Sequence, residues 1–97
     1  MPDLSEFQAK IRELYGPRDE ARGLYETFAW LVEEMGELSR ALRREDRDNL
    51  ELEFADVTAW LVSVANLAGV DVGRAVDTVY GDGCPRCGGT PCDCPMR

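Results

Sequence analysis

Two long segments with apolar residues at helical spacing, joined by a short polar stretch, constrain the fold of this chain most strongly. Apolar side chains recur every three or four positions along residues 24–42 and again along residues 50–68. Residues 45–49 between them are polar and charged, which is typical of a turn between antiparallel helices. We therefore predict an antiparallel helical hairpin.

Shorter helices are expected on both sides of the hairpin. Residues 4–15 carry apolar side chains at helical spacing, and Gly16 and Pro17 are expected to end this first helix. The next helix is expected to begin near Asp19 or Glu20 and to run to about residue 44, which makes it the first arm of the hairpin.

Capping signals place the remaining helices. Asp48 or Asn49 is expected to cap the third helix, which runs to about residue 68 and stops at Gly69. Asp71 is expected to cap a short fourth helix that ends near Tyr80. Because no strand pattern competes anywhere in the sequence, the predicted fold class is all-α.

The length of 97 residues allows one domain with one core. We divide the chain into a helical domain over residues 1–80 and a cysteine-rich tail over residues 81–97, which holds all four Cys and three of the five Pro. A hairpin with two short helices buries only part of its apolar surface. We therefore expect a homodimer or homotetramer that resembles a four-helix bundle.

Charge and composition exclude several classes of partner. Nineteen acidic residues against 11 basic ones give a formal charge of −8, which disfavours binding to nucleic acid polymers or anionic membranes. No apolar run approaches the roughly 18 residues of a membrane span, and residues 1–10 are acidic and amphipathic, so we expect a soluble, cytoplasmic protein. Because the chain has no His, carboxylates must serve as metal ligands and as acid–base groups.

Two carboxylate pairs lie at matching spacing on the apolar arcs of the hairpin helices. Glu34 and Glu37 are three positions apart on the first helix, and so are Glu53 and Asp56 on the second. Each pair can therefore point both carboxylates at the same spot. A buried carboxylate takes up a proton, pairs with a cation or coordinates a metal. Since the nearby Arg residues cluster at the turn, a cation from solution is the natural neutraliser.

The donor type indicates which cation this is. Oxygen donors favour hard ions, Mg²⁺ or Mn²⁺, and Mg²⁺ commonly bridges protein carboxylates to substrate phosphates. The pattern therefore predicts phosphate chemistry. The alternative is that these acids rim a helix interface as solvated or Arg-paired charge.

The acids read together as EExxE, from Glu33 to Glu37, followed by ExxD, from Glu53 to Asp56, within the strings LVEEMGEL and LEFADVTAWLV. With the Gly-Val-Asp turn at residues 69–71, this pattern resembles the MazG-like all-α nucleoside triphosphate pyrophosphohydrolase superfamily over residues 4–80. That superfamily also includes dimeric dUTPases, dCTP pyrophosphatases and phosphoribosyl-ATP pyrophosphohydrolases.

The resemblance implies both a reaction and a metal site. Members cleave a nucleoside triphosphate between the α and β phosphates, giving a nucleoside monophosphate and pyrophosphate. By this resemblance, Mg²⁺ is coordinated by Glu34, Glu37, Glu53 and Asp56. Glu33 is then a further ligand or the group that orients the attacking water, so Glu33 and Glu34 are the catalytic candidates. Such metal ions polarise phosphoryl oxygens and supply hydroxide near neutral pH without His.

The chain departs from its relatives after the fourth predicted helix. Many relatives carry Lys, Asn or Arg there that reach substrate phosphates, whereas residues 77–80 of this chain lead straight into the cysteine segment. Arg side chains elsewhere are candidate replacements, although Arg at a helix end commonly complements the helix dipole. Tryptophans on the same arcs as the acids are candidates to stack on a base, with core packing as the alternative. The candidate substrate-binding residues are Trp30, Arg40, Trp60 and Arg74.

The tail carries Cys84, Cys87, Cys92 and Cys94 in the pattern C-x2-C-x4-C-x-C, and its opening CPRCG resembles the zinc knuckle of zinc ribbons. Four thiolates can close a tetrahedral structural Zn²⁺ site. A disulfide or redox dithiol and free, disordered cysteines are the alternatives. The rival function for the whole chain is a zinc-stabilised helical interaction module that binds a basic partner without catalysis.

Overall fold

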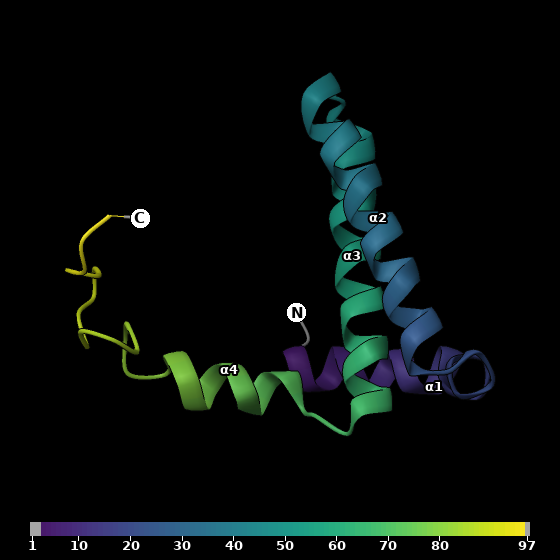
Figure 1. Cartoon of the computed structure of the whole chain (residues 1–97), viewed down its shortest axis with the longest axis horizontal. Helices are drawn as coiled ribbons and strands as arrows, with labels where there is room; N and C mark the ends of the chain where they lie inside the picture. The colour runs from purple at the N-terminus through teal and green to yellow at the C-terminus, as the bar shows by residue number, and fades with distance from the viewer. Residues whose placement is uncertain (1–2, 97) are drawn as a thin grey trace.

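The computed structural model describes residues 3–96, and four α-helices make up most of this span. They are α1 (Leu4–Arg22), α2 (Leu24–Arg44), α3 (Arg47–Ala68) and α4 (Val72–Tyr80) (Figure 1). No strand occurs among the described residues, which confirms the predicted all-α fold. The predicted domain bounds at residues 1 and 97 lie outside the described residues.

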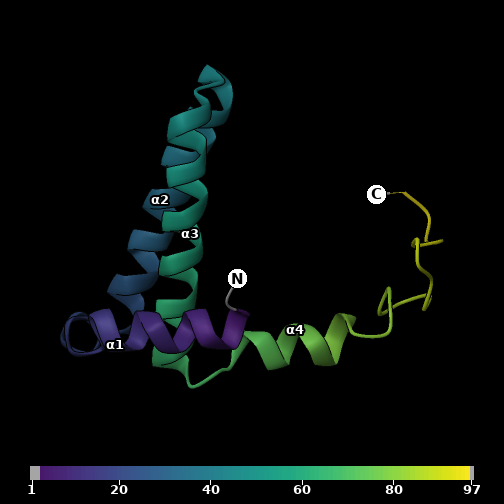
Figure 2. The same ribbon diagram turned by 180° about the vertical axis from the view of Figure 1, so that it is seen from behind.

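The predicted hairpin is confirmed by α2 and α3, which lie side by side in Figures 1 and 2. The buried apolar side chains of these two helices are small or branched, which lets the two backbones pack closely. The buried apolar residues of the hairpin are Leu31, Ala41, Leu50, Val62 and Ala65.

The turn of the hairpin is shorter than predicted. Asp46 caps α3 by accepting a hydrogen bond from the backbone N–H of Asn49 at 3.4 Å, so the expectation that Asp48 or Asn49 is the cap was wrong. The reason lies in Glu45, which ends α2 in the left-handed conformation at φ 53°. This conformation reverses the chain at once, and the next residue is already the cap.

The first helix continues past its predicted end. α1 runs through Gly16 and Pro17, so the expectation that these residues end it was wrong. Pro17 forfeits one backbone hydrogen bond, but its fixed φ is compatible with a helix. The break falls at Gly23, whose φ of 92° favours glycine. As a result, α2 begins after Gly23 and not near Asp19 or Glu20.

α1 crosses the base of the hairpin and packs mainly on α3 (Figures 1 and 2). The buried side chain of Gln8 links the two helices. Its amide nitrogen donates to Asn66 Oδ1 at 2.9 Å and to the carbonyl of Val70 at 2.7 Å. Its amide oxygen accepts from the backbone N–H of Val72 at 2.9 Å. Because these polar groups are buried and paired, they fix α1 against the turn between α3 and α4.

The fourth helix begins at its predicted cap. The carboxylate of Asp71 accepts hydrogen bonds from the backbone N–H of Arg74 at 3.0 Å and from the hydroxyl of Ser5 at 2.8 Å. These bonds hold the pKa of Asp71 below its ordinary value. Gly69 ends α3 at φ 74°, as predicted. α4 then leaves α3 at a bend of 96° and carries the cysteine tail away from the hairpin (Figures 1 and 2).

Among the described residues, no single helix is long and apolar enough to cross a membrane. The bent pair of α3 and α4 meets the requirement only when both helices are taken together, by length and composition.

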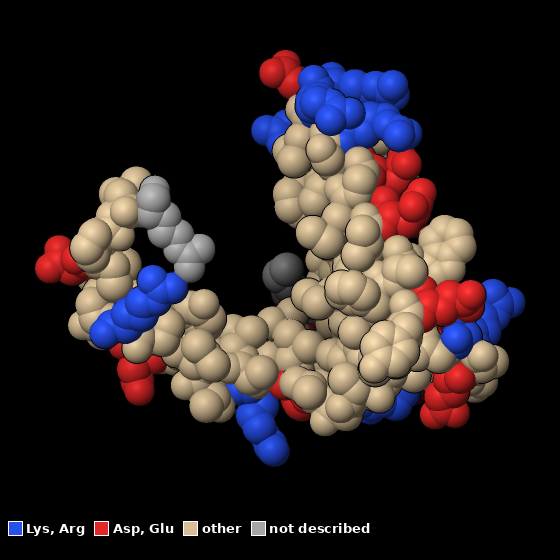
Figure 3. Space-filling view, in the orientation of Figure 1, with Lys and Arg blue, Asp and Glu red and all other residues tan. Residues whose placement is uncertain are grey.

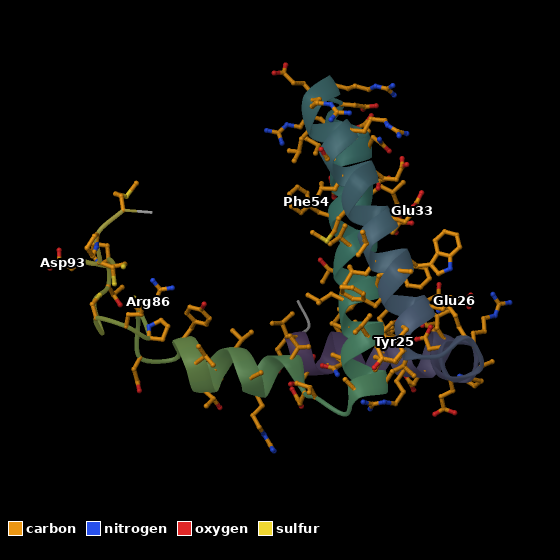
Figure 4. The ribbon with its side chains drawn as sticks, viewed as in Figure 1. Tyr25, Glu26, Glu33, Phe54, Arg86 and Asp93 are labelled. Atoms are coloured by element: carbon orange, nitrogen blue, oxygen red, sulfur yellow. The ribbon has the colours of Figure 1, made fainter. Side chains whose placement is uncertain are left out.

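A large share of the apolar surface stays exposed in the single chain. On the apolar arc predicted for α2, Leu31 is buried, but Phe28 is 51% exposed and Met35 is 54% exposed. Phe54 on α3 is 54% exposed and points toward the open side between the hairpin and the tail (Figure 4). Exposed apolar area of this kind is typical of a surface that a partner covers.

Candidate metal centre

Three carboxylates converge across the hairpin. Glu34 on α2 and Glu53 and Asp56 on α3 each place an oxygen within 4.8 Å of the other two. Glu53 is 8% exposed, and the other two residues are half-buried. The spacing of three residues on α3 and the antiparallel packing of α2 together bring these side chains to one place.

The donor set fits a divalent cation. Oε2 of Glu53 is buried and has no hydrogen-bond partner among the described residues, which is costly for a carboxylate. The ion pairs found in residues 3–96 involve other acids, namely Asp19 and Glu37. A hard cation between the three carboxylates would satisfy the unpaired oxygen and neutralise the converging charge.

The electrostatics of Glu34 agree with this arrangement. Burial is the largest cause that raises the pKa of Glu34 above its ordinary value. The negative charges of Asp56 and Glu53 raise this pKa further, and those of Glu37 and Glu33 add to them. The three converging carboxylates therefore repel one another in the absence of a cation, and a bound cation would remove that repulsion.

The structure does not bring every predicted acid into the group. Glu37 lies outside the three converging carboxylates, and its side chain pairs with Arg40 on the next turn of α2 at 3.3 Å. Because Arg40 lies three positions along the same helix, it draws the carboxylate of Glu37 along α2. Glu33 is exposed on the outer side of α2 (Figure 4). Among the predicted acids, the triad of Glu34, Glu53 and Asp56 is therefore the candidate metal centre.

A cavity of about 270 Å³ opens beside the triad, on the side of Asp56. Residues of α1 and α3 line it together. They are Tyr15, Arg18, Asp19, Arg22, Asp56, Ala59, Trp60 and Ser63. The cavity thus combines a carboxylate of the triad with two Arg side chains and an aromatic ring.

Asp19 and Arg22 line the candidate site but were not predicted from the sequence. Asp19 is 3% exposed, and its Oδ1 pairs with Nη1 of Arg22 at 2.9 Å. Both residues belong to the last turn of α1, which was expected to end at Gly16. An acid followed three residues later by a base on a continued helix was the signal that could have indicated this pair.

Trp60 is the aromatic wall of the cavity. The guanidinium of Arg22 lies 4.9 Å from the centre of a Trp60 ring, a cation–π contact. Trp30 stacks on Trp60 with ring centres 6.2 Å apart and an angle of 23° between the rings. Trp30 does not line the cavity and is 47% exposed. The structure thus places Trp60, but not Trp30, at the candidate site.

Neither of the two predicted Arg residues lines this cavity. Arg40 lies on the other hairpin helix and pairs with Glu37. Arg74 lies on α4 and lines a separate hollow with Asp3 and Asp71. Basic side chains gather instead at the tip of the hairpin, where α2 ends (Figure 3). The cations beside the triad are those of α1.

The tail cysteines form a second cluster at the far end of α4. Their four sulfur atoms lie within 4.8 Å of one another, and all four residues are free thiols. Backbone N–H groups of Asp93 and Gly89 lower the pKa of Cys87 to about 6. Hydrogen bonding with the neighbouring sulfurs, that of Cys92 first, raises the pKa of Cys94 to about 11.

The chain is an all-α protein in which carboxylates of two facing hairpin helices lie close enough to hold a metal ion together. Within that class, the MazG nucleotide pyrophosphohydrolase domain matches residues 23–81, and the chain belongs to this family. The match covers α2, α3 and α4 and therefore includes the whole triad. Among curated proteins, none matches the chain. The family assignment confirms the expected resemblance and makes the chain a nucleotide hydrolase at the level of the family.

Proposed function

We propose that this protein hydrolyses a nucleoside triphosphate between the α and β phosphates in a Mg²⁺-dependent reaction, giving a nucleoside monophosphate and pyrophosphate. The observation that carries the proposal is the convergence of Glu34, Glu53 and Asp56 within the family-matched hairpin, with an unpaired buried oxygen on Glu53. A triphosphate needs charge neutralisation, which a carboxylate-bound cation provides.

Each residue of the triad would serve as a metal ligand. Bound Mg²⁺ would polarise a phosphoryl oxygen and lower the pKa of a bound water. Three protein ligands are fewer than the six that Mg²⁺ takes, so water and substrate would complete its shell. By the family resemblance, Glu33 is the candidate to orient the attacking water, a role that requires its side chain to turn toward the triad from the outer side of α2.

The cavity beside Asp56 is the proposed nucleotide site. Trp60 would stack on the base in the place that the guanidinium of Arg22 takes in this structure, and such stacking tolerates any base. Arg18 and Arg22, which line the cavity from α1, would offer positive charge for the phosphates. They would supply the phosphate contacts that we predicted for Arg40 and Arg74.

We also propose that the working form is a homodimer or homotetramer. The exposed apolar side chains on the hairpin, Phe28, Met35 and Phe54 among them, support this proposal. A second copy of the hairpin would cover them in a four-helix arrangement. Light scattering of the purified protein tests the proposal: a mass of one chain at micromolar concentration would contradict it.

The direct test is product analysis on a panel of canonical and modified nucleoside triphosphates. We expect pyrophosphate and nucleoside monophosphate in equal amounts for at least one substrate, with no release when Mg²⁺ is withheld. The Asp56→Asn variant should lose most of this activity, whereas Glu51→Gln should keep it. Glu51 is a matched control because it is an exposed acid on the same helix, outside the triad.

The rival function, a non-catalytic module that binds a basic partner, makes the opposite predictions. Under it, neutralising Glu34, Glu37, Glu53 and Asp56 together raises the melting temperature and leaves capture of the partner intact. Mg²⁺ then has no effect on the melting temperature. A folded protein that turns over none of the panel and binds no Mg²⁺ would favour this rival.

A further inference from the structure

The cysteine cluster is outside the family-matched region and has no part in the proposed hydrolysis. Its four sulfur atoms nevertheless lie within 4.8 Å of one another. Cys84 and Cys94 have their sulfurs 3.8 Å apart, and those of Cys87 and Cys92 are 4.0 Å apart. Four thiols brought this close on an exposed loop require a physical reason.

These separations match the edges of a tetrahedral metal–thiolate site. In a regular tetrahedron the distance between two ligands is about 1.63 times the metal–ligand distance. With Zn–S bonds of about 2.3 Å, the sulfurs are expected about 3.8 Å apart. Both pairs measured above agree with this value to within a few tenths of an ångström. Two of the six sulfur–sulfur separations therefore fit a tetrahedral site, and the other four are at most 4.8 Å.

Backbone N–H groups surround two of the four sulfurs. Cys87 Sγ accepts from the backbone N–H of Asp93 at 3.2 Å and of Gly89 at 3.4 Å. Cys92 Sγ accepts from the backbone N–H of Cys94 at 3.3 Å. The loop therefore places polar groups around the cluster, as outer-shell partners do around metal ligands.

The tail has no apolar core to hold this arrangement. None of the residues 81–96 is buried. The chain turns between the first two cysteines through two backbone hydrogen bonds, from Gly88 to the carbonyl of Cys84 at 2.7 Å and from Cys84 to the carbonyl of Gly89 at 3.1 Å. Ordering an exposed loop is opposed by conformational entropy. A bound ion supplies the stabilisation that burial does not.

We infer that Cys84, Cys87, Cys92 and Cys94 bind one structural Zn²⁺ ion as a tetrahedral thiolate site. Four protein ligands leave no open coordination position, so the ion orders the tail and does not take part in the hydrolysis. Sulfur donors select zinc over the hard ions that suit the carboxylate triad. This inference does not depend on the proposed function, because it concerns separate residues and a separate metal.

The test is metal analysis of the full-length protein purified under reducing conditions with trace Zn²⁺ in the medium. We expect one zinc per chain. The Cys87→Ser and Cys94→Ser variants should each bind zinc at least 100-fold more weakly, whereas Arg86→Ala should keep it. Arg86 is a matched control because it lies between two of the ligands, and among the described residues its side chain forms no hydrogen bond to a sulfur. Glu53→Gln should also keep the zinc, which separates this site from the carboxylate triad.

Cobalt substitution gives a second measurement that does not depend on a variant. Co²⁺ added to the metal-depleted protein should produce the strong visible absorption of tetrahedral thiolate cobalt, and Zn²⁺ should displace it. Zinc that is absent from a protein with native helical circular dichroism would overturn the inference. Bound iron in place of zinc, loss of the zinc in Glu53→Gln, or two disulfides under reducing conditions would overturn it as well.

Discussion

The carboxylate triad and the cysteine cluster gather metal ligands in opposite surroundings. The triad stands on two packed helices, where Glu53 is buried and the other two acids are half-buried. The cysteines stand on a loop in which no residue is buried. Three oxygen donors leave room for substrate on a hard ion, whereas four sulfur donors close the shell of a soft one. From this difference we infer that two packed helices can hold a metal site with open coordination positions. A site whose four positions are all filled by the protein can instead order the loop that carries it.

The largest expected effect separates the two centres by activity. Asp56→Asn removes a charged ligand from the triad, so we expect kcat/KM for pyrophosphate release to fall on the order of 10²–10³-fold. Cys87→Ser should leave it unchanged, because the cluster lies at the far end of α4. Initial rates at saturating Mg²⁺ measure both. A loss of equal size in Cys87→Ser would mean that the tail takes part in the reaction, and it would contradict separate roles for the two centres.

The next effect concerns thermal stability. Mg²⁺ at about 100 times its Kd should add about 2.7 kcal/mol to the free energy of unfolding. For a chain of this size that corresponds to a rise in melting temperature of roughly 10–20 °C. The rise should vanish in Glu53→Gln and persist in Cys94→Ser. Differential scanning calorimetry with and without Mg²⁺ provides the measurement, and a rise that depends on the cysteines would reverse the assignment of metals.

A smaller effect sharpens the description of the open centre. Trp60 lines the cavity beside Asp56, and base stacking is worth about 1–3 kcal/mol. Trp60→Ala should therefore raise KM by roughly 5- to 150-fold, with kcat less affected. Trp30→Ala is the matched control, since Trp30 stacks on Trp60 but does not line the cavity. Equal increases in both variants would show that the pair is only structural packing.

The smallest effect is a pH dependence of the metal-free protein. Burial and the nearby acids raise the pKa of Glu34 above its ordinary value of 4.5, so the folded chain holds this proton more tightly than the unfolded chain does. Stability should therefore decrease as the pH rises from about 4.5 through the raised pKa. Urea unfolding at a series of pH values measures this, with Glu34→Gln as the variant in which the slope is expected to disappear. A free energy of unfolding that increases with pH over this range would contradict the repulsion between the three carboxylates.

Local signals in the sequence predicted much of the fold. The cap at Asp71 and the stop at Gly69 were predicted correctly because each depends on one residue and its immediate neighbours. The expected end of α1 at Gly16 and Pro17 was wrong because the packing of α1 on α3 sustains the helix through them. The helix propensities of single residues do not include this stabilisation by tertiary packing.

The spacing indicated that acids of both hairpin helices come together, and the structure brings Glu34, Glu53 and Asp56 to one place. Glu53 and Asp56 converge as expected for two acids one turn apart on α3. Glu37 satisfies the same spacing with Glu34, but Arg40 competes for its carboxylate. Asp19 reaches the cavity only because α1 crosses the hairpin, a feature of the tertiary structure. Contacts between distant segments thus account for the part of the site that the sequence left open.

The most direct test of the central claim is a Mn²⁺ titration followed by the amide signals of the protein in solution NMR. Mn²⁺ replaces Mg²⁺ on oxygen ligands and broadens the signals of nuclei near it. The account predicts that the signals of Glu34, Glu53 and Asp56 broaden first, that Mg²⁺ restores them, and that the tail stays sharp. Broadening that begins elsewhere, or that spreads evenly over the acidic surface, would contradict a metal centre on the hairpin.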